Sequence, residues 1–375
     1  MANTSLLFHF RPTLPLKTFS LFEVGSHQSY FDHTAFQQQV DIKVQHTLLP
    51  WVEWLEAMER KFSDRFQVAL CIGGIALENL SHNHPELLKR LVALSRIGTV
   101  EWVSTPYYDS LSFLYGRGEF MRQVQMHREG IVQLGLESPT SFYHPGGIYG
   151  NPMAFLAERL GFRSMFTEPQ AAWGERRDPH YLCHPAHMDL PRLVLRHAEL
   201  SSRISAPDGF NPADLASSLS NAPGQLSHLT IDLNQIPFGG KASLWQHLIH
   251  EYLANKGQRL VAPMELSNWG AEGGTLDATD FISEQGPDFN LHPWRGNPMQ
   301  EEALEKLYWM EGQVQAWQNP QLIHTWSLLQ QSSLFGYMGE RHHAFSSPYR
   351  TPHEAYLHFM NILADFEIGQ REQVV

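Results

Sequence analysis

The sequence predicts an α/β barrel with a helical region toward its C-terminal end. Short apolar runs alternate with stretches of helical periodicity through the first half of the chain, as in repeated strand–helix–strand units that build a parallel sheet. About five such units precede Glu168, which favours a closed barrel over an open sheet. Beyond residue 300 only helical stretches follow. The chain therefore divides into a barrel and a helical part.

The expected strands are short apolar runs bounded by Gly, Pro or polar residues. They cover 6–11, 66–74, 100–103, 141–144, 163–167 and 229–233. The run 66–74 is almost continuously apolar and ends in two glycines, as a buried parallel strand that opens onto a loop does. Helices are expected where apolar residues recur every three or four positions: 44–61, 85–95, 120–134, 153–160, 244–256, 301–317, 320–331 and 352–366.

These elements predict three segments. A barrel is expected over residues 1–264, and a helical region packed on it over 301–375. Between them, residues 265–300 are rich in Gly, Asp, Asn and Pro. We expect this middle segment to be a long loop that contributes to a cleft.

Composition excludes several classes of function. The 375 residues include 27 Lys and Arg against 39 Asp and Glu, a net charge of −12, so neither nucleic acid nor an anionic membrane is the expected partner. Two cysteines, Cys71 and Cys183, cannot form a disulfide framework. No apolar run reaches the roughly 18 residues of a membrane span, and the N-terminus has no signal-peptide pattern. We expect a cytoplasmic protein.

Chemistry in an α/β barrel is found where the strands end at their carboxyl side. The expected strand ends are His9, 73–78, 101–108, 144–149, Glu168 and 232–239. These ends and several later phrases resemble glycoside hydrolase family 57, the α-amylase-like proteins, from about residue 7 to 367. The phrases are Phe8–His9, Gly98–Glu101, Phe142–Tyr149, Ile231–Asp232, Phe238–Gly239, Trp294–Asn297 with Gln300, Trp326 with Leu329–Gln330, Ser347–Tyr349 through Asn361, and Asp365–Phe366.

The resemblance implies a (β/α)7 barrel that acts on α-1,4-glucans with retention of configuration. Such a mechanism needs two carboxyl groups, a nucleophile and an acid/base. The family phrase that ends Glu-Leu-Ile-Tyr, with Glu as nucleophile, has Gly146 in the place of that Glu. The acid/base position retains Asp232, while the neighbouring Glu of the family is Asn234. The resemblance thus predicts a member that has lost its nucleophile.

Other site positions are also altered. The opening His-Gln-Pro of the family is His9-Phe10-Arg11-Pro12, which keeps the His and loses the Gln. A family His that follows two aromatic residues is Asp109, and a late Ser-Asp-His phrase ends in Leu334. Phe10 and Leu334 are large enough to fill part of the cleft. Changes concentrated at the site, with the aromatic and glycine framework kept, are typical of a non-catalytic descendant.

The expected sugar contacts are His9, Glu101, Trp102, His144, Asn234 and Trp294. Each has a simpler explanation. Glu101 and Asp232 are also consistent with hydrogen-bonded structural carboxylates, His9 with a buried core histidine, and both tryptophans with core packing. No cofactor or metal is expected, because the pairs His82/His84, His184/His187 and His342/His343 form no recognised ligand pattern. Glu168 is the nearest substitute for the lost nucleophile, although it follows a different strand.

Three functions remain open at this stage. The first is a protein without hydrolase activity that binds glycogen or a maltooligosaccharide, beside an active homologue or another protein of glycogen metabolism. The second is an active retaining hydrolase or glucanotransferase with Asp232 as acid/base and a non-standard nucleophile. The third is a protein-interaction module with a closed pocket. The sequence favours the first.

Overall fold

The computed structural model describes residues 3–26, 29–170, 177–206, 209–236, 238–285, 290–316, 318–339 and 347–373. Within these ranges no helix has the length and apolar character needed to cross a membrane. The expected helix end at Trp317 and the pair His342/His343 lie outside them.

Seven parallel strands form a ring in the described part of the chain. In one sheet β1 (Asn3–Phe10) lies between β2 (Val68–Ile72) and β8 (Leu226–Asp232), with β3 (Val100–Trp102) beyond β2. The other sheet has the order β4 (Ser141–Tyr143), β5 (Ser164–Thr167) and β7 (Arg192–Leu195). A separate two-stranded pair joins β6 (His184–Pro185) to β9 (Thr275–Leu276).

The two larger sheets meet at two seams. At one seam Ser104, just after β3, forms a parallel bridge with Phe142 of β4. At the other, Arg196, just after β7, forms a parallel bridge with His228 of β8. Because β1 and β8 are also paired along their length, these bridges close the ring. The α/β barrel expected from the sequence is therefore confirmed, with the first strand paired to the last.

Successive side chains along each strand point alternately into the ring and toward the helices, which produces two apolar layers. Leu7, Ala69, Val103, Tyr143 and Val194 belong to a small buried cluster inside the ring. Their neighbours in sequence, such as Phe8 and Leu70, belong to the larger cluster between strands and helices. Strands buried on both faces explain why they are apolar runs in the sequence. Since side chains alternate, His9 and Arg11 share the inward direction of Leu7.

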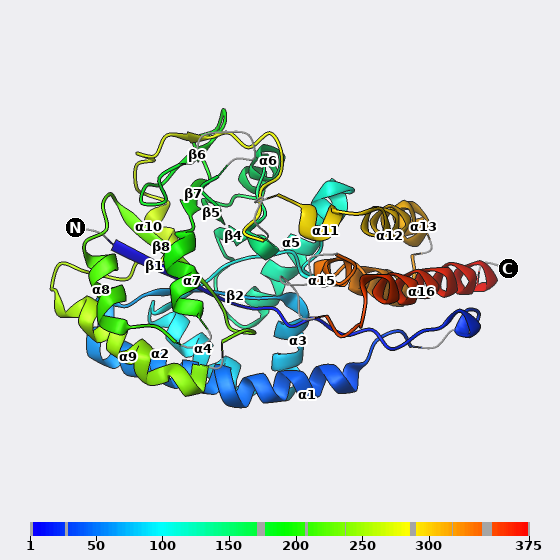
Figure 1. Cartoon of the computed structure of the whole chain (residues 1–375), viewed down its shortest axis with the longest axis horizontal. Helices are drawn as coiled ribbons and strands as arrows, with labels where there is room; N and C mark the ends of the chain where they lie inside the picture. The colour runs from blue at the N-terminus through cyan, green and yellow to red at the C-terminus, as the bar shows by residue number, and fades with distance from the viewer. Residues whose placement is uncertain are drawn as a thin grey trace.

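Helices surround this ring, and Figure 1 shows α1, α2 and α9 along one side of it while α12, α13, α15 and α16 gather at one end of the molecule. The longer helices are α1 (His33–Lys43), α2 (Leu49–Phe62), α3 (Gly74–Asn83), α4 (Pro85–Arg96), α5 (Arg117–Gln133), α6 (Asn151–Arg159), α7 (Ala198–Ser205), α8 (Pro212–Ser220), α9 (Phe238–Ala254), α12 (Pro298–Trp309), α14 (Pro320–Leu328) and α16 (Pro352–Gln373). The short ones are α10 (Pro263–Leu266), α11 (His292–Arg295), α13 (Glu311–Ala316) and α15 (Ser332–Gly336).

Several expected boundaries were wrong. The helix expected at 44–61 begins at His33, because α1 continues through a π-helical turn over Val44–Leu48 into α2. The helix expected at 301–317 is broken into α12 and α13. The segment 265–300, expected to be a long loop, contains β9 and α11. These elements are two to four residues long, too short for periodicity to reveal them.

Candidate active site

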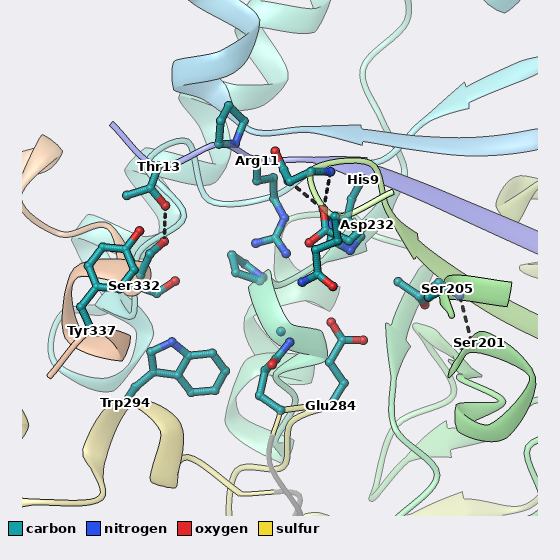
Figure 2. A pocket seen from close by; sticks show the side chains of 18 of the residues that line it. His9, Arg11, Thr13, Ser201, Ser205, Asp232, Glu284, Trp294, Ser332 and Tyr337 are labelled. Atoms are coloured by element: carbon teal, nitrogen blue, oxygen red, sulfur yellow. Dashed lines mark hydrogen bonds and ion pairs between the residues drawn. The ribbon is translucent and has the colours of Figure 1, made fainter. Parts of the chain in front are cut away.

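A cavity of about 610 Å³ opens at the carboxyl ends of the strands. Its lining residues come from β1 and β8 with the segments that follow them, from α1, α7, α11 and α15, and from the loops after β4, β7 and β9. They are His9, Arg11, Pro12, Thr13, Pro15, Gln39, Pro145, Gly146, Arg196, Ser201, Ser202, Ser205, Thr230, Asp232, Asn234, Gln235, Glu284, Gln285, Trp294, Ser332, Ser333, Tyr337 and Pro348. Figure 2 shows Arg11 and Asp232 on one side of this space, with Glu284 and Trp294 pointing into it from the opposite side.

Asp232 ends β8 and is held by its neighbours. Its register partner on β1 is His9, whose Nδ1 lies 3.6 Å from Asp232 Oδ1. The same oxygen accepts hydrogen bonds from the backbone N and the side-chain Nδ2 of Asn234, at 2.8 and 2.7 Å. Burial raises the pKa of Asp232, with Arg11 opposing the shift. Burial, followed by the charge of Arg11, lowers the pKa of His9 to about 3, so the imidazole is neutral at pH 7.

Arg11 carries a positive charge into the cavity wall. Its guanidinium lies over the Tyr143 ring, 5.4 Å from the centroid, and its Nη1 is 3.7 Å from Asp109 Oδ1. Burial raises the pKa of Asp109 to about 6, although Arg11 opposes this. The guanidinium of Arg11 also lines the cavity.

A second group of charges lies on the facing side. The hydroxyl of Tyr143 donates to Glu284 Oε1 at 2.6 Å, and Arg196 Nε is 3.5 Å from Glu284 Oε2. Arg196 also donates to Glu168 Oε1 at 2.7 Å. Glu168 has only 1% of its side chain exposed, whereas Glu284 lines the cavity with 8% exposed. The carboxylate that reaches the cavity is therefore Glu284 rather than Glu168.

Gly146 lines the cavity in a backbone conformation that favours glycine. Its φ is +70°, and a Cβ added there would lie 2.6 Å from Trp294 Cη2. Contacts this short do not occur between a Cβ and an aromatic ring, so the indole occupies the space that a side chain at this position would need. Trp294 is 1% exposed and is carried by the short helix α11.

Three of the expected sugar contacts are not in this cavity. Glu101 pairs with Ala69 in the strand register, so it lies nearer the amino ends of the strands than His9 does. The chain continues beyond Glu101 to the bridge at Ser104 before it reaches the carboxyl ends. Its carboxylate accepts hydrogen bonds from Ser141 Oγ at 3.0 Å and Met264 N at 2.8 Å. Trp102 points to the opposite face of the same strand, into the larger core. Both residues line another cavity, at the amino ends of the strands.

His144 is likewise a core residue. It is 1% exposed, its Nε2 lies 3.1 Å from the carbonyl of Ser110, and its ring lies edge-on to Phe113. Phe10 and Leu334 also belong to the core and are not among the lining residues, so neither fills the cavity. Of the expected positions, the cavity brings together His9, Gly146, Asp232, Asn234 and Trp294.

Two of the charged residues at the site were missed as candidates from the sequence. Arg196 follows β7, a four-residue strand with no expected counterpart, and Glu284 lies in the segment expected to be a loop. The only available signal for Arg196 was its place directly after the short apolar run Leu193–Leu195. Glu284 has no comparable signal, because nothing in its neighbourhood is periodic.

Several buried polar atoms at the cavity make no hydrogen bond to the described residues. They are His9 Nδ1, Arg11 Nε, Arg196 Nε and Asn234 Oδ1. A buried polar atom without a partner costs about 1–3 kcal/mol, so such a cluster favours a ligand rich in hydroxyl groups. Among the described residues no group of three or more His, Cys, Asp and Glu side chains is arranged to hold a metal ion.

The family model "Glycosyl hydrolase family 57" matches residues 14–259, more than half of the chain, so the chain belongs to this family. The expected family is thus confirmed. A protein of Methanocaldococcus jannaschii that bears the name "Putative alpha-amylase" is 26% identical over 339 residues, which cover 82% of this chain and 72% of that protein. Glu284 and Trp294 lie beyond the matched segment of the family model.

Solved structures show the same fold at low identity. A 4-alpha-glucanotransferase from Thermococcus litoralis aligns with a TM-score of 0.67 and 14% identity, over 89% of this chain and 56% of that one. The chain thus spans little more than half of that enzyme. A branching enzyme of the same family from Pyrococcus horikoshii aligns with a TM-score of 0.67 and 12% identity, over 96% and 88%. The alpha-amylase AmyC from Thermotoga maritima gives 0.62 and 11%, over 97% and 93%.

Proposed function

We propose that this protein binds a segment of α-1,4-linked glucan, such as a maltooligosaccharide or a glycogen branch, in the cavity at the carboxyl ends of its strands. One observation carries the proposal: the cavity combines an indole, Trp294, with buried polar atoms that have no hydrogen-bond partner in the described chain. Aromatic rings pack against the C–H faces of sugars, and the hydroxyl groups would pair with the polar atoms.

The same cavity argues against cleavage by the family's double displacement. That route needs a carboxylate nucleophile in addition to the acid/base. Gly146 has no side chain, and the indole of Trp294 fills the space where one would begin. Asp232 remains, with a raised pKa that suits an acid, but it has no partner at position 146. The proposal is therefore a glucan-binding protein in which retaining hydrolysis has been lost.

A closed, protein-binding module is less well supported, because the cavity has about 610 Å³ of free space and neither Phe10 nor Leu334 lines it. The relatives named alpha-amylase, branching enzyme and glucanotransferase support an α-glucan as the ligand class. An active homologue or another protein of glycogen metabolism remains a proposed partner.

Isothermal titration of the purified protein with maltoheptaose tests the proposal. We expect saturable binding to maltoheptaose and weaker binding to cellohexaose, whose β-linkages place successive hydroxyls differently. Asp232→Asn and His9→Ala should weaken binding, since both residues line the cavity. Glu101→Gln serves as the control, because its side chain is outside this cavity. Equal affinity for the two oligosaccharides, or no binding at all, would contradict the proposal.

A further inference from the structure

We propose that Lys43 and Thr47, at the π-helical turn between α1 and α2, are positioning residues of the glucan site. They hold the loop of residues 232–236, which follows β8 and forms part of the cavity wall. The inference rests on the proposed binding of a glucan in the cavity. A site that is built on a loop depends on contacts from outside the loop to fix its shape.

The loop 232–236 turns back on its first residue, Asp232. The backbone N of Asn234 donates to Asp232 Oδ1 at 2.8 Å. The backbone N atoms of Gln235 and Ile236 donate to the carbonyl oxygen of Asp232 at 3.1 and 3.2 Å. These bonds leave the side chains of Asp232, Asn234 and Gln235 on the cavity wall. The carbonyl groups of Asn234 and Ile236 then need partners from outside the loop.

Side chains from the adjoining helical turn supply those partners. Lys43 Nζ donates to the carbonyl of Asn234, and Thr47 Oγ1 donates to the carbonyl of Ile236 at 3.2 Å. Thr47 is 1% exposed, so its hydrogen bond is shielded from water. The two contacts lie on either side of Gln235 in the chain. They therefore fix the backbone of the part of the loop that presents Asn234 and Gln235 to a ligand.

The π-helical turn explains how these donors come to face the loop. Its hydrogen bond runs from the backbone N of Leu49 to the carbonyl of Val44, so the turn holds one residue more than an α-helical turn does. One extra residue rotates α1 by about 100° relative to α2. Gln39 lies one turn before Lys43 on the same face of α1, and it lines the cavity. The turn thus lets α1 face the cavity while α2 keeps its apolar face in the core.

A glycine brings the same turn against the chain that follows the loop. Gly239 lies in the first turn of α9, in the phrase Phe238–Gly239. A Cβ there would lie 2.9 Å from the carbonyl oxygen of His46, so α9 packs directly on the backbone of the π-helical turn. The Phe238 ring lies 5.4 Å from the ring of Trp54 in α2. The π-helical turn and α2 therefore hold α9 as well as the loop before it.

The test measures maltoheptaose binding by calorimetry for the full-length wild type, Lys43→Met, Lys43→Arg and Lys61→Met. Lys61 is an exposed lysine of α2 that contacts His250 and does not line the cavity, so its variant is the matched control. We expect Lys43→Met to weaken binding roughly tenfold, about what a hydrogen bond from a charged donor contributes. Lys43→Arg should restore most of the affinity, because a guanidinium also donates. Lys61→Met should match the wild type.

Backbone hydrogen exchange, followed by mass spectrometry on the same proteins, separates positioning from overall stability. In Lys43→Met the amides of residues 233–236 should exchange faster, while those of β2 keep the wild-type rate. Thr47→Val removes the hydroxyl of the second contact with little change in shape. It should have the same effect on exchange and weaken binding roughly threefold, as expected for a neutral hydrogen bond.

Three results would overturn the inference: wild-type affinity in Lys43→Met, failure of Lys43→Arg to restore binding, or faster exchange that is spread evenly over the barrel. A wild type that does not bind maltoheptaose would instead contradict the proposed function. Exchange at residues 233–236 would then decide alone whether Lys43 holds the loop, so the two failures are distinguishable.

Discussion

The indole of Trp294 lies where a side chain at position 146 would begin, with its Cη2 2.6 Å from the Cβ that Gly146 lacks. This relationship shows that the space beside Gly146 is already filled by an aromatic ring. The indole of Trp294 on α11 and the side chain of Gln285 surround this glycine, at 2.6 and 3.3 Å from the position of its absent Cβ. Any side chain introduced at position 146 must therefore displace a buried ring.

The first prediction is that Gly146→Ala destabilises the fold more than a glycine replacement without a steric clash. Both Gly146 and Gly98 have positive φ, but a Cβ at Gly98 would have no neighbour within 4 Å. Gly98→Ala should show only the conformational penalty, about 1 kcal/mol. Gly146→Ala should cost about 1–3 kcal/mol more, because overpacking forces Trp294 to shift. Urea unfolding of both variants checks this, and equal losses would show that Trp294 yields freely.

The second prediction is that Gly146→Glu does not create a retaining enzyme. The new carboxylate would have to share its space with the ring of Trp294. Groups that act together in catalysis are strongly non-additive, so one restored residue among several altered ones is not enough. We expect no α-anomer from maltoheptaose by NMR. Formation of the α-anomer would show that the nucleophile was the only functional loss.

The third prediction concerns Glu101, whose placement away from the cavity makes it a determinant of stability. Burial raises its pKa to about 7, with hydrogen bonds from Met264 and Ser141 opposing. A carboxyl whose pKa is raised on folding binds its proton more tightly in the folded state. The contribution of Glu101 to the free energy of unfolding is therefore complete at low pH, and it is lost as the pH rises from about 4.5 through 7. The loss amounts to about 3 kcal/mol.

Glu101→Gln tests this, because an amide keeps a neutral group in the same place. Between pH 5 and 8 the unfolding free energy of the wild type should fall relative to that of the variant. Parallel pH profiles from urea melts at several pH values would contradict the assignment.

The fourth prediction follows from buried histidines. Burial lowers the pKa of His9, His144 and His228 to about 3 and that of His127 to about 4. These groups bind protons in the unfolded chain but not in the folded one at pH 4.5–6, so the protein loses stability as the pH falls below about 6.5. Each contributes about 1.4 kcal/mol per pH unit in that window.

His127→Gln isolates one of these contributions, since His127 lies on α5, outside the cavity. Its unfolding free energy should depend on pH less steeply than that of the wild type, by about 1.4 kcal/mol per unit. Chemical denaturation at pH 4.5, 5 and 6 gives the slope. An unchanged slope would mean that His127 is protonated in the folded protein.

The last prediction concerns the ion pair behind the cavity. Arg196→Met removes the guanidinium that hydrogen-bonds a carboxylate with 1% of its side chain exposed, and breaking such a buried ion pair should cost about 3–5 kcal/mol. Adding Glu168→Gln removes the buried charge and should recover much of that loss. A double variant no more stable than the single one, in the same thermal and urea assays, would show that Arg196 contributes by packing instead.

The parts of the fold that the sequence could predict are those with strong local patterns. The strands expected at 66–74 and 229–233 are present as β2 and β8, with ends shifted by one to three residues. The structure adds that His9 lies beside Asp232, because parallel strands end at one edge. Glu101 was expected at the carboxyl end of its strand, but it lies nearer the amino ends, since the strand continues beyond the apolar run to Ser104. Glu284 reached the site through the hydrogen bond of its backbone to Gly146, a tertiary contact with no local signature.

The pairing of β1 with β8 has a consequence for how the protein is made. Asn3 lies opposite Leu226 and His9 opposite Asp232, so the first strand to leave the ribosome waits for one of the last strands of the barrel. Contacts so distant in sequence slow folding and leave the edge of β1 open to wrong partners. During synthesis the wall of the cavity that His9 and Asp232 form cannot be assembled until most of the barrel exists. The cavity is thus completed late in folding, and any ligand that occupied it would favour the finished barrel over its partly folded precursors.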